Sequence, residues 1–174
     1  MTRRFSRTQS LFAAAPIIAI LALASCQRAK PLYVDGAYVR LSPDPDNPAA
    51  GYFTIHGGAQ PVTLLAVETD AAVRLEMHQS MTTAGNMASM QPIQTVDVPA
   101  GQKVKFAPGG KHLMIWQINP QAIAAGKMEF KLIFSNGDRL LVDAVIQGVD
   151  GRPVGNGGDA PTTGADNSHT EVVH

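Results

Sequence analysis

Residues 128–147, MEFKLIFSNGDRLLVDAVIQ, contain two apolar-rich segments separated by a short polar turn. Asn136-Gly137 lies in the turn, and this dipeptide favours a two-residue hairpin connection because both residues tolerate positive φ. Apolar and polar residues largely alternate in the flanking segments, which is typical of strands that bury one face. The stretch therefore predicts two antiparallel strands, 128–134 and 140–147.

Similar strand patterns extend back to residue 33, with Gly and Pro residues between them. Residues 119–126 suit one short helical turn, and no long amphipathic helix competes with the strands. Many short strands separated by turns predict an all-β domain, either a sandwich or a barrel. The other predicted strands are 33–41, 51–56, 62–68, 73–81, 87–93, 103–106 and 112–118.

The composition fits one globular domain, because 45% of the 174 residues are hydrophobic and only 16% are charged. The 14 Lys and Arg residues balance the 14 Asp and Glu residues and form no basic stripe, so nucleic acid is not an expected partner. The sequence contains no evident Ser-His-Asp order, catalytic carboxylate pair or phosphate-binding loop. A hydrolase function therefore has no support in the sequence.

The N-terminus has the pattern of an export signal, with three arginines ahead of an apolar run at 11–24. This run is shorter than the about 20 apolar residues that a membrane-spanning helix needs. It ends at Leu23-Ala24-Ser25-Cys26, which resembles the lipobox of bacterial lipoproteins. The resemblance implies a signal peptide at 1–25, lipidation of Cys26, a tether at 26–32 and a lipid anchor on the periplasmic side of the cell envelope.

The composition changes again near the C-terminus. From about Asp150 the chain is rich in Gly, Pro, Asp, Asn and Thr, which predicts a disordered tail at 150–174 and a folded domain at 33–149. Removal of Arg3, Arg4 and Arg7 with the signal peptide leaves 11 basic residues against 14 acidic ones. The mature chain is therefore expected to be mildly acidic.

Cys26 is the only cysteine, so its lipidation leaves no free thiol. Disulfides and thiolate metal ligands are therefore excluded, and so is a blue-copper electron-transfer site, which requires a cysteine thiolate. A soft metal ion would have to be bound by methionine thioethers. These suit an oxidising compartment because they need no deprotonation and form no disulfides.

Methionine is concentrated in one region, since Met77, Met81, Met87 and Met90 lie within fourteen residues. A single methionine is usually a core residue, but this clustering favours a functional role for part of the set. Polar residues around position 78 alternate with an apolar face that includes Met77. His78 is therefore expected to point away from the core.

Residues 112–114 form a second candidate region. Residues two apart share one face of a strand, so His112 and Met114 project together and can chelate one ion, while Leu113 packs inward. Gly109-Gly110 permits a sharp turn just before this pair. The turn predicts that the pair lies at a sheet edge.

The four candidate ligands have the spacing of a known signature. His78 is followed by an optional methionine position, which Gln79 occupies here, then by ten residues, Met90, twenty-one residues, His112, one residue and Met114. The pattern resembles the periplasmic copper chaperones called PCuAC. The likeness covers about 33–147, notably 50–55, 98–101 and 107–114. It implies a cupredoxin-like Greek-key β-sandwich in which His78, Met90, His112 and Met114 bind one Cu(I).

The ligand chemistry agrees with this implication, since Cu(I) favours thioether and imidazole ligands whereas Cu(II) prefers harder nitrogen and oxygen ligands. The resemblance further implies a metallochaperone, which binds and transfers copper and is not an enzyme. It would deliver the copper to the CuA-bearing subunit of cytochrome c oxidase, directly or with other copper-transfer proteins. Copper sequestration for tolerance, without a dedicated recipient, is an alternative because it would use the same ligands. A structural or adhesive sandwich with incidental methionines is a further alternative.

Three residues near the signature have weaker claims to a role. Met81 and Met87 are predicted equally well as auxiliary thioethers or as ordinary loop and core residues. Trp116 shares a face with His112 in a regular strand, and packing is its favoured role.

Three other histidines lie outside the signature. His56 is predicted to be an ordinary surface histidine. His169 and His174 lie in the predicted tail. Some PCuAC relatives have His- and Met-rich tails that bind additional copper, so the resemblance makes these two residues candidate Cu(II) ligands.

Overall fold

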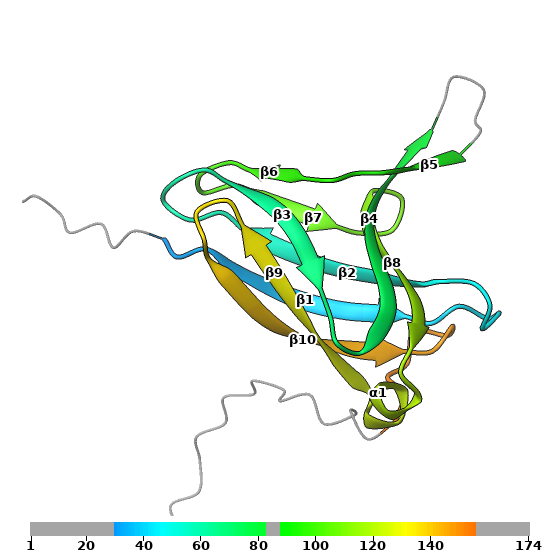
Figure 1. The fold of residues 1–174 in the computed structure, drawn as a ribbon. Helices are drawn as coiled ribbons and strands as arrows, with labels where there is room; N and C mark the ends of the chain where they lie inside the picture. The colour runs from blue at the N-terminus through cyan, green and yellow to red at the C-terminus, as the bar shows by residue number, and fades with distance from the viewer. Residues whose placement is uncertain (1–29, 83–87, 156–174) are drawn as a thin grey trace, which may run out of the picture.

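The computed structural model describes residues 30–82 and 88–155, which form ten strands and one short helix (Figure 1). The longest strand, β4, has 11 residues, and the helix has only 6. The elements are β1 (Tyr33–Arg40), β2 (Ala49–His56), β3 (Val62–Glu68), β4 (Ala72–Thr82), β5 (Ala88–Pro92), β6 (Val96–Val98), β7 (Lys103–Phe106), β8 (Lys111–Ile118), α1 (Pro120–Ala125), β9 (Lys127–Phe134) and β10 (Arg139–Gln147).

The strands form one continuous sheet in the order β5-β4-β8-β7-β2-β1-β10-β9-β3-β6. Figure 1 shows this sheet curling over, so that β3 and β9 lie across the interior from β2 and β1. Most neighbours are antiparallel, but β1 and β10 run parallel, with Tyr38 opposite Val145, and so do β7 and β8, with Phe106 opposite Lys111. The prediction of an all-β fold is confirmed.

Local signals located most elements correctly. β9 and β10 form the predicted antiparallel pair, and Gly137 in their turn has a φ of 89°. The predicted helical turn is α1, whose first turn is capped by the Asn119 side chain and whose end is capped by left-handed Gly126. The short strand β6 was not predicted, because three residues are too few to show a reliable alternation.

The prediction that His112 and Met114 lie at a sheet edge is wrong. Their strand, β8, pairs with β4 on one side and with β7 and β2 on the other. The hairpin of β4 and β5 occupies the expected edge position. The turn at Gly109-Gly110 is present, with Gly109 at a φ of 77°, but a local turn signal says nothing about which distant strand will pair beyond it.

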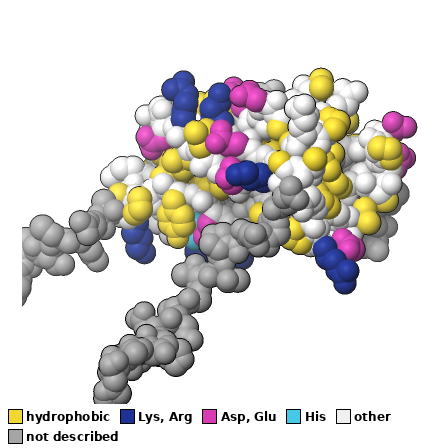
Figure 2. All heavy atoms as spheres, turned by 90° about the horizontal axis from the view of Figure 1, so that it is seen from below, with side chains coloured by type: hydrophobic (Ala, Val, Ile, Leu, Met, Phe, Trp, Pro, Cys, Tyr) yellow, Lys and Arg dark blue, Asp and Glu magenta, His cyan; other side chains and the backbone are white. Residues whose placement is uncertain are grey.

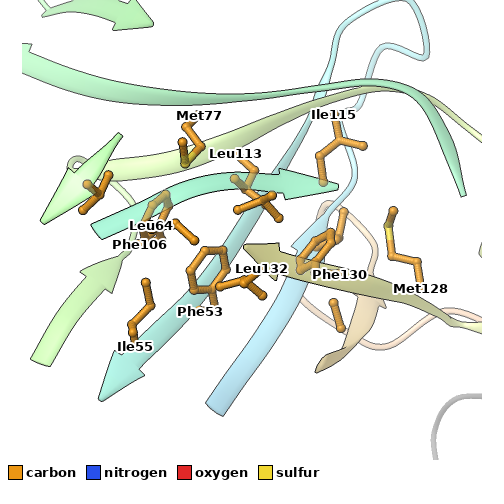
Figure 3. Packing of buried hydrophobic residues seen from close by; sticks show 14 of the residues in the cluster. Phe53, Ile55, Leu64, Met77, Phe106, Leu113, Ile115, Met128, Phe130 and Leu132 are labelled. Atoms are coloured by element: carbon orange, nitrogen blue, oxygen red, sulfur yellow. The ribbon is translucent and has the colours of Figure 1, made fainter. Parts of the chain in front are cut away.

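The core fills the interior of the curled sheet and contains residues from both of its ends (Figure 3). The ring of Phe53 on β2 lies 4.3 Å from that of Phe106 and 6.3 Å from that of Phe130, measured between centroids. Met77 and Leu113 extend the core beneath β4 and β8. Because side chains alternate along a strand, the neighbours of these two residues, among them His78 and His112, lie on the outer face.

The ordered domain continues past the predicted boundary at residue 149. After β10 the chain turns back, so that Pro153 pairs with Gln147 and the amide of Val154 donates to the Ile146 carbonyl. Val154 packs against the core. Residues 150–155 are therefore part of the folded domain, and the rest of the predicted tail, 156–174, lies outside the described residues.

The outer surface carries charges of both signs. Figure 2 shows Lys and Arg beside Asp and Glu on one face, interspersed with hydrophobic side chains. Ion pairs on the outer face of the sheet include Lys131 with Glu68 at 2.7 Å and Lys127 with Asp143 at 3.5 Å. Within the described ranges, no helix has the length and hydrophobicity to cross a membrane.

Candidate metal centre

His78 and His112 stand opposite each other on the adjacent antiparallel strands β4 and β8. Their ring centroids are 6.1 Å apart. Directly opposed residues project from the same face of a sheet, and one face is therefore shared by the two imidazoles. The expectation that His78 points away from the core is confirmed, since its neighbour Met77 is in the core.

The strand register places both candidate thioethers on this same outer face. Met114 lies two residues from His112 and opposes Glu76 on β4. Met90 on β5 opposes Ser80, which lies two residues from His78. Since side chains alternate between faces, the layer formed by β5, β4 and β8 presents all four candidate ligands on one side.

The four residues differ in their exposure to solvent. His112 is only 7% exposed, and the side chain of His78 is 13% exposed, whereas Met90 is 58% exposed. The imidazole side of the site is thus closed by protein, and the side formed by β5 is open. Such an arrangement can hold an ion and leave one thioether accessible to an incoming ligand.

Each imidazole has one nitrogen close to a protein oxygen. Nδ1 of His112 lies 3.0 Å from the carbonyl oxygen of Gly110. Nε2 of His78 lies 3.1 Å from a carboxylate oxygen of Glu76. The other nitrogen of His78, Nδ1, is buried and has no hydrogen-bond partner among the described residues.

Glu76 and Arg74 also belong to this face and were missed by sequence reasoning. The Arg74 guanidinium donates to the second Glu76 oxygen through Nε and Nη2, each at 2.8 Å, and lies 4.2 Å from the Trp116 ring centroid. The hydrogen bond from His78, followed by the Arg74 contacts, lowers the pKa of the Glu76 carboxyl. The even spacing of residues 74, 76 and 78 was the available signal, because it places all three on one strand face.

The ligand types at this site are unusual for a hard metal ion. Within residues 30–82 and 88–155, no group of three or more His, Cys, Asp or Glu side chains is placed to hold a metal. His78 and His112 form a pair without a third ligand of that kind. A metal bound here would need further ligands, and the methionine thioethers on the same face are suitable for a soft ion.

The residues with weaker claims are placed as follows. Met81 opposes Ser89 and therefore lies on the opposite face of β4 from His78, with 46% exposure. The face of the Trp116 ring is occupied by Arg74, which agrees with a packing role. Met87, Cys26, His169 and His174 lie outside the described residues.

The prediction that His56 is an ordinary surface histidine is wrong. Its side chain is only 12% exposed and lies 3.0 Å from a carboxylate oxygen of Asp35. The ring of Tyr33 stacks on it, with 4.1 Å between centroids. Tyr33 opposes His56 across the β1–β2 pair, and this partner from a distant part of the sequence covers the imidazole.

The curled all-β sheet is shared with solved PCuAC copper chaperone domains. The copper-bound PCuAC domain from PmoF2 superposes with a TM-score of 0.53 at 17% identity, over 69% of this chain and 97% of that one. Cu(I)-DR1885 from Deinococcus radiodurans gives 0.54 at 25% identity, over 72% and 84%. The fold is therefore the cupredoxin-like β fold of PCuAC domains.

At the family level, the chain belongs to the LpqE-like lipoprotein family, whose model matches residues 32–146. A relative from Leifsonia xyli subsp. xyli, Lxx21020, is also named as a lipoprotein. It is 26% identical over 94 residues, which are 54% of this chain. The match spans 57% of that relative's length.

Proposed function

We propose that this protein is a copper metallochaperone of the cell envelope that binds one Cu(I) through His78, Met90, His112 and Met114. The observation that carries the proposal is the register of β5, β4 and β8, which gathers two imidazoles and two thioethers on one outer face. The solved Cu(I) form of DR1885, which has the same fold, supports it. In this proposal the protein binds and transfers copper and is not an enzyme.

The chemistry of the four ligands explains why the ion would be Cu(I). Imidazole and thioether are neutral, soft or borderline ligands that suit a closed-shell monovalent ion better than Cu(II). Four neutral ligands leave the ion's single positive charge in place, so the ion is bound without the electrostatic attraction of anionic thiolates. The exposure of Met90 allows a recipient's ligand to displace a thioether and take the ion.

An anaerobic titration against a Cu(I) chelator tests the ligand set. We expect one tight equivalent for the purified protein, with affinity lowered about tenfold or more by His112→Ala, Met114→Ala or Met90→Leu. Met81→Leu is a matched control, because Met81 belongs to the same hairpin but lies on the opposite face. Equal weakening by both leucine substitutions, or by neither, would contradict the assignment of Met90.

The proposed recipient of the copper is the CuA-bearing subunit of cytochrome c oxidase. Delivery and sequestration would use the same ligands, so a deletion strain is needed to separate them. Loss of oxidase activity that added copper restores would support delivery. Copper sensitivity with normal oxidase activity would instead support sequestration for tolerance.

We further propose that Cys26 carries a lipid anchor on the periplasmic side of the envelope. Membership of a lipoprotein family supports this. In Figure 1 the first described residues and β5 lie at opposite sides of the domain. A tether before β1 would therefore leave the outer face of β5, β4 and β8, which carries the four candidate ligands, free. Cys26→Ser should move the protein from the membrane fraction to the soluble fraction, as seen by immunoblotting. Retention in the membrane fraction would contradict the anchor.

A further inference from the structure

We propose that Glu76 is a positioning residue that makes His78 bind Cu(I) through Nδ1, whereas His112 binds through Nε2. This inference rests on the proposed function and adds the ligand atoms and the residue that selects one of them. It starts from the 3.1 Å contact between Nε2 of His78 and Oε2 of Glu76.

The tautomer of each imidazole follows from the group beside it. An ionised carboxylate and a backbone carbonyl can only accept hydrogen bonds. Glu76 therefore requires the hydrogen of neutral His78 to be on Nε2, and the Gly110 carbonyl requires the hydrogen of neutral His112 to be on Nδ1. The lone pairs that remain for a metal are on Nδ1 of His78 and on Nε2 of His112.

The burial of His78 supports the same assignment. Nδ1 of His78 is buried without a hydrogen-bond partner among the described residues. A buried polar atom without a partner is unfavourable, and a bound ion or water is one of the features that account for such an atom in a folded protein. A lone pair that has no donor among the described residues is available to bind an ion.

Glu76 is itself held in place from its other side. Its Oε1 accepts from Nε and Nη2 of Arg74, each at 2.8 Å, while its Oε2 contacts His78. The Arg74 guanidinium in turn lies over the Trp116 ring at 4.2 Å. Trp116, Arg74 and Glu76 thus form a chain that ends at His78 and fixes its ring. Metal-binding histidines are commonly oriented by such a carboxylate on the second nitrogen.

The first test reads the tautomers directly by ¹⁵N NMR of the imidazoles, without any substitution. In the copper-free protein we expect hydrogen on Nε2 of His78 and on Nδ1 of His112. Addition of Cu(I) should then shift the signals of Nδ1 of His78 and Nε2 of His112. The opposite tautomer at His78, or a copper-induced shift at its Nε2, would overturn the inference.

The second test measures Cu(I) affinity in variants that retain the cooperative thermal transition. Glu76→Ala should bind about tenfold more weakly, and His78 should then populate both tautomers while His112 is unchanged. Glu76→Gln should show a smaller loss, because its amide oxygen can still accept from Nε2. Glu68→Ala is the matched control, since it removes a paired carboxylate from β3, and its affinity should equal that of the unsubstituted protein.

The outcomes separate this inference from the proposed function. If the unsubstituted protein binds no Cu(I), the proposed function fails. If it binds Cu(I) and Glu76→Ala binds equally tightly with the same His78 tautomer, the role of Glu76 fails and the proposed function stands. A tenfold loss in Glu76→Ala with a changed His78 tautomer supports both.

Discussion

At the scale of single residues, Gln117 is the one non-glycine residue of the described ranges with a positive φ, 54°. It follows Trp116 on β8, directly after the run that contains His112 and Met114. The left-handed conformation is unfavourable for a residue with a Cβ atom. Such strain is often found next to functional segments, and at Gln117 it lies where the outer face of β8 ends.

Replacing Gln117 by glycine should therefore stabilise the domain. Left-handed backbone costs a non-glycine residue about 1–2 kcal/mol. Relief of this strain is partly offset, because glycine has greater conformational freedom in the unfolded chain, which costs about 0.5–1 kcal/mol on folding. We expect Gln117→Gly to raise the free energy of unfolding by about 0.5–1 kcal/mol, measured by urea denaturation. Gln121→Gly, within α1, should lower it, and the same sign for both variants would contradict this account of Gln117.

At the scale of elements, the end of β2 is joined closely to the turn before β7. The amide of Gly57 donates to the Gln102 carbonyl at 2.7 Å, and the amide of Gly101 donates to the Gly58 carbonyl at 2.9 Å. The backbones approach so closely that a Cβ atom on Gly57 would lie 2.3 Å from the Pro99 carbonyl oxygen. A glycine is needed at position 57 for space, since its φ is not positive.

Gly57→Ala should consequently destabilise the junction between β2 and β7. The clash is with backbone atoms, which cannot rotate away as a side chain does, so we expect a loss of about 1–3 kcal/mol, as for other overpacked sites. Thermal denaturation followed by circular dichroism measures it. Gly110→Ala is the comparison, because its added Cβ would meet the nearest atom at an ordinary 3.5 Å. A larger loss at Gly110 than at Gly57 would contradict the clash.

At the scale of the whole molecule, the core joins strands that are not neighbours in the sheet. Phe130 on β9 is fully buried and packs near Phe53 on β2, three strands away in the sheet order. The outer face that carries the four candidate ligands depends on this core, because Met77 and Leu113 pack beneath β4 and β8. The outer ligands therefore keep their register only while the curled sheet is intact.

Phe130→Ala should weaken the entire domain in one step. Truncating a buried phenylalanine typically costs about 3–5 kcal/mol. We expect a single cooperative urea transition at a lower midpoint, with Cu(I) binding lost in the same transition. Leu141→Ala on the neighbouring strand β10 should change stability by less than about 0.5 kcal/mol, because Leu141 is 62% exposed. Separate transitions for copper binding and unfolding would contradict the coupling.

Features that depend on near neighbours along the chain could be predicted before the fold was known. Alternation and the Asn136-Gly137 turn predicted the strands, and the Gly, Pro and Asn residues around 119–126 predicted the helical turn that became α1. The same alternation predicted that His78 faces outward and that His112 and Met114 share a face. These predictions succeeded because side-chain direction in a strand is a local property with a period of two residues.

The pairing of distant strands, and therefore the surroundings of each candidate ligand, could be seen only in the folded chain. It made β8 an interior strand, brought His78 opposite His112, and covered His56 with Tyr33. It also placed the Arg74 guanidinium of β4 over the Trp116 ring of β8. Strand pairing is set by burial of a shared core over the whole chain, and no local pattern contains that information.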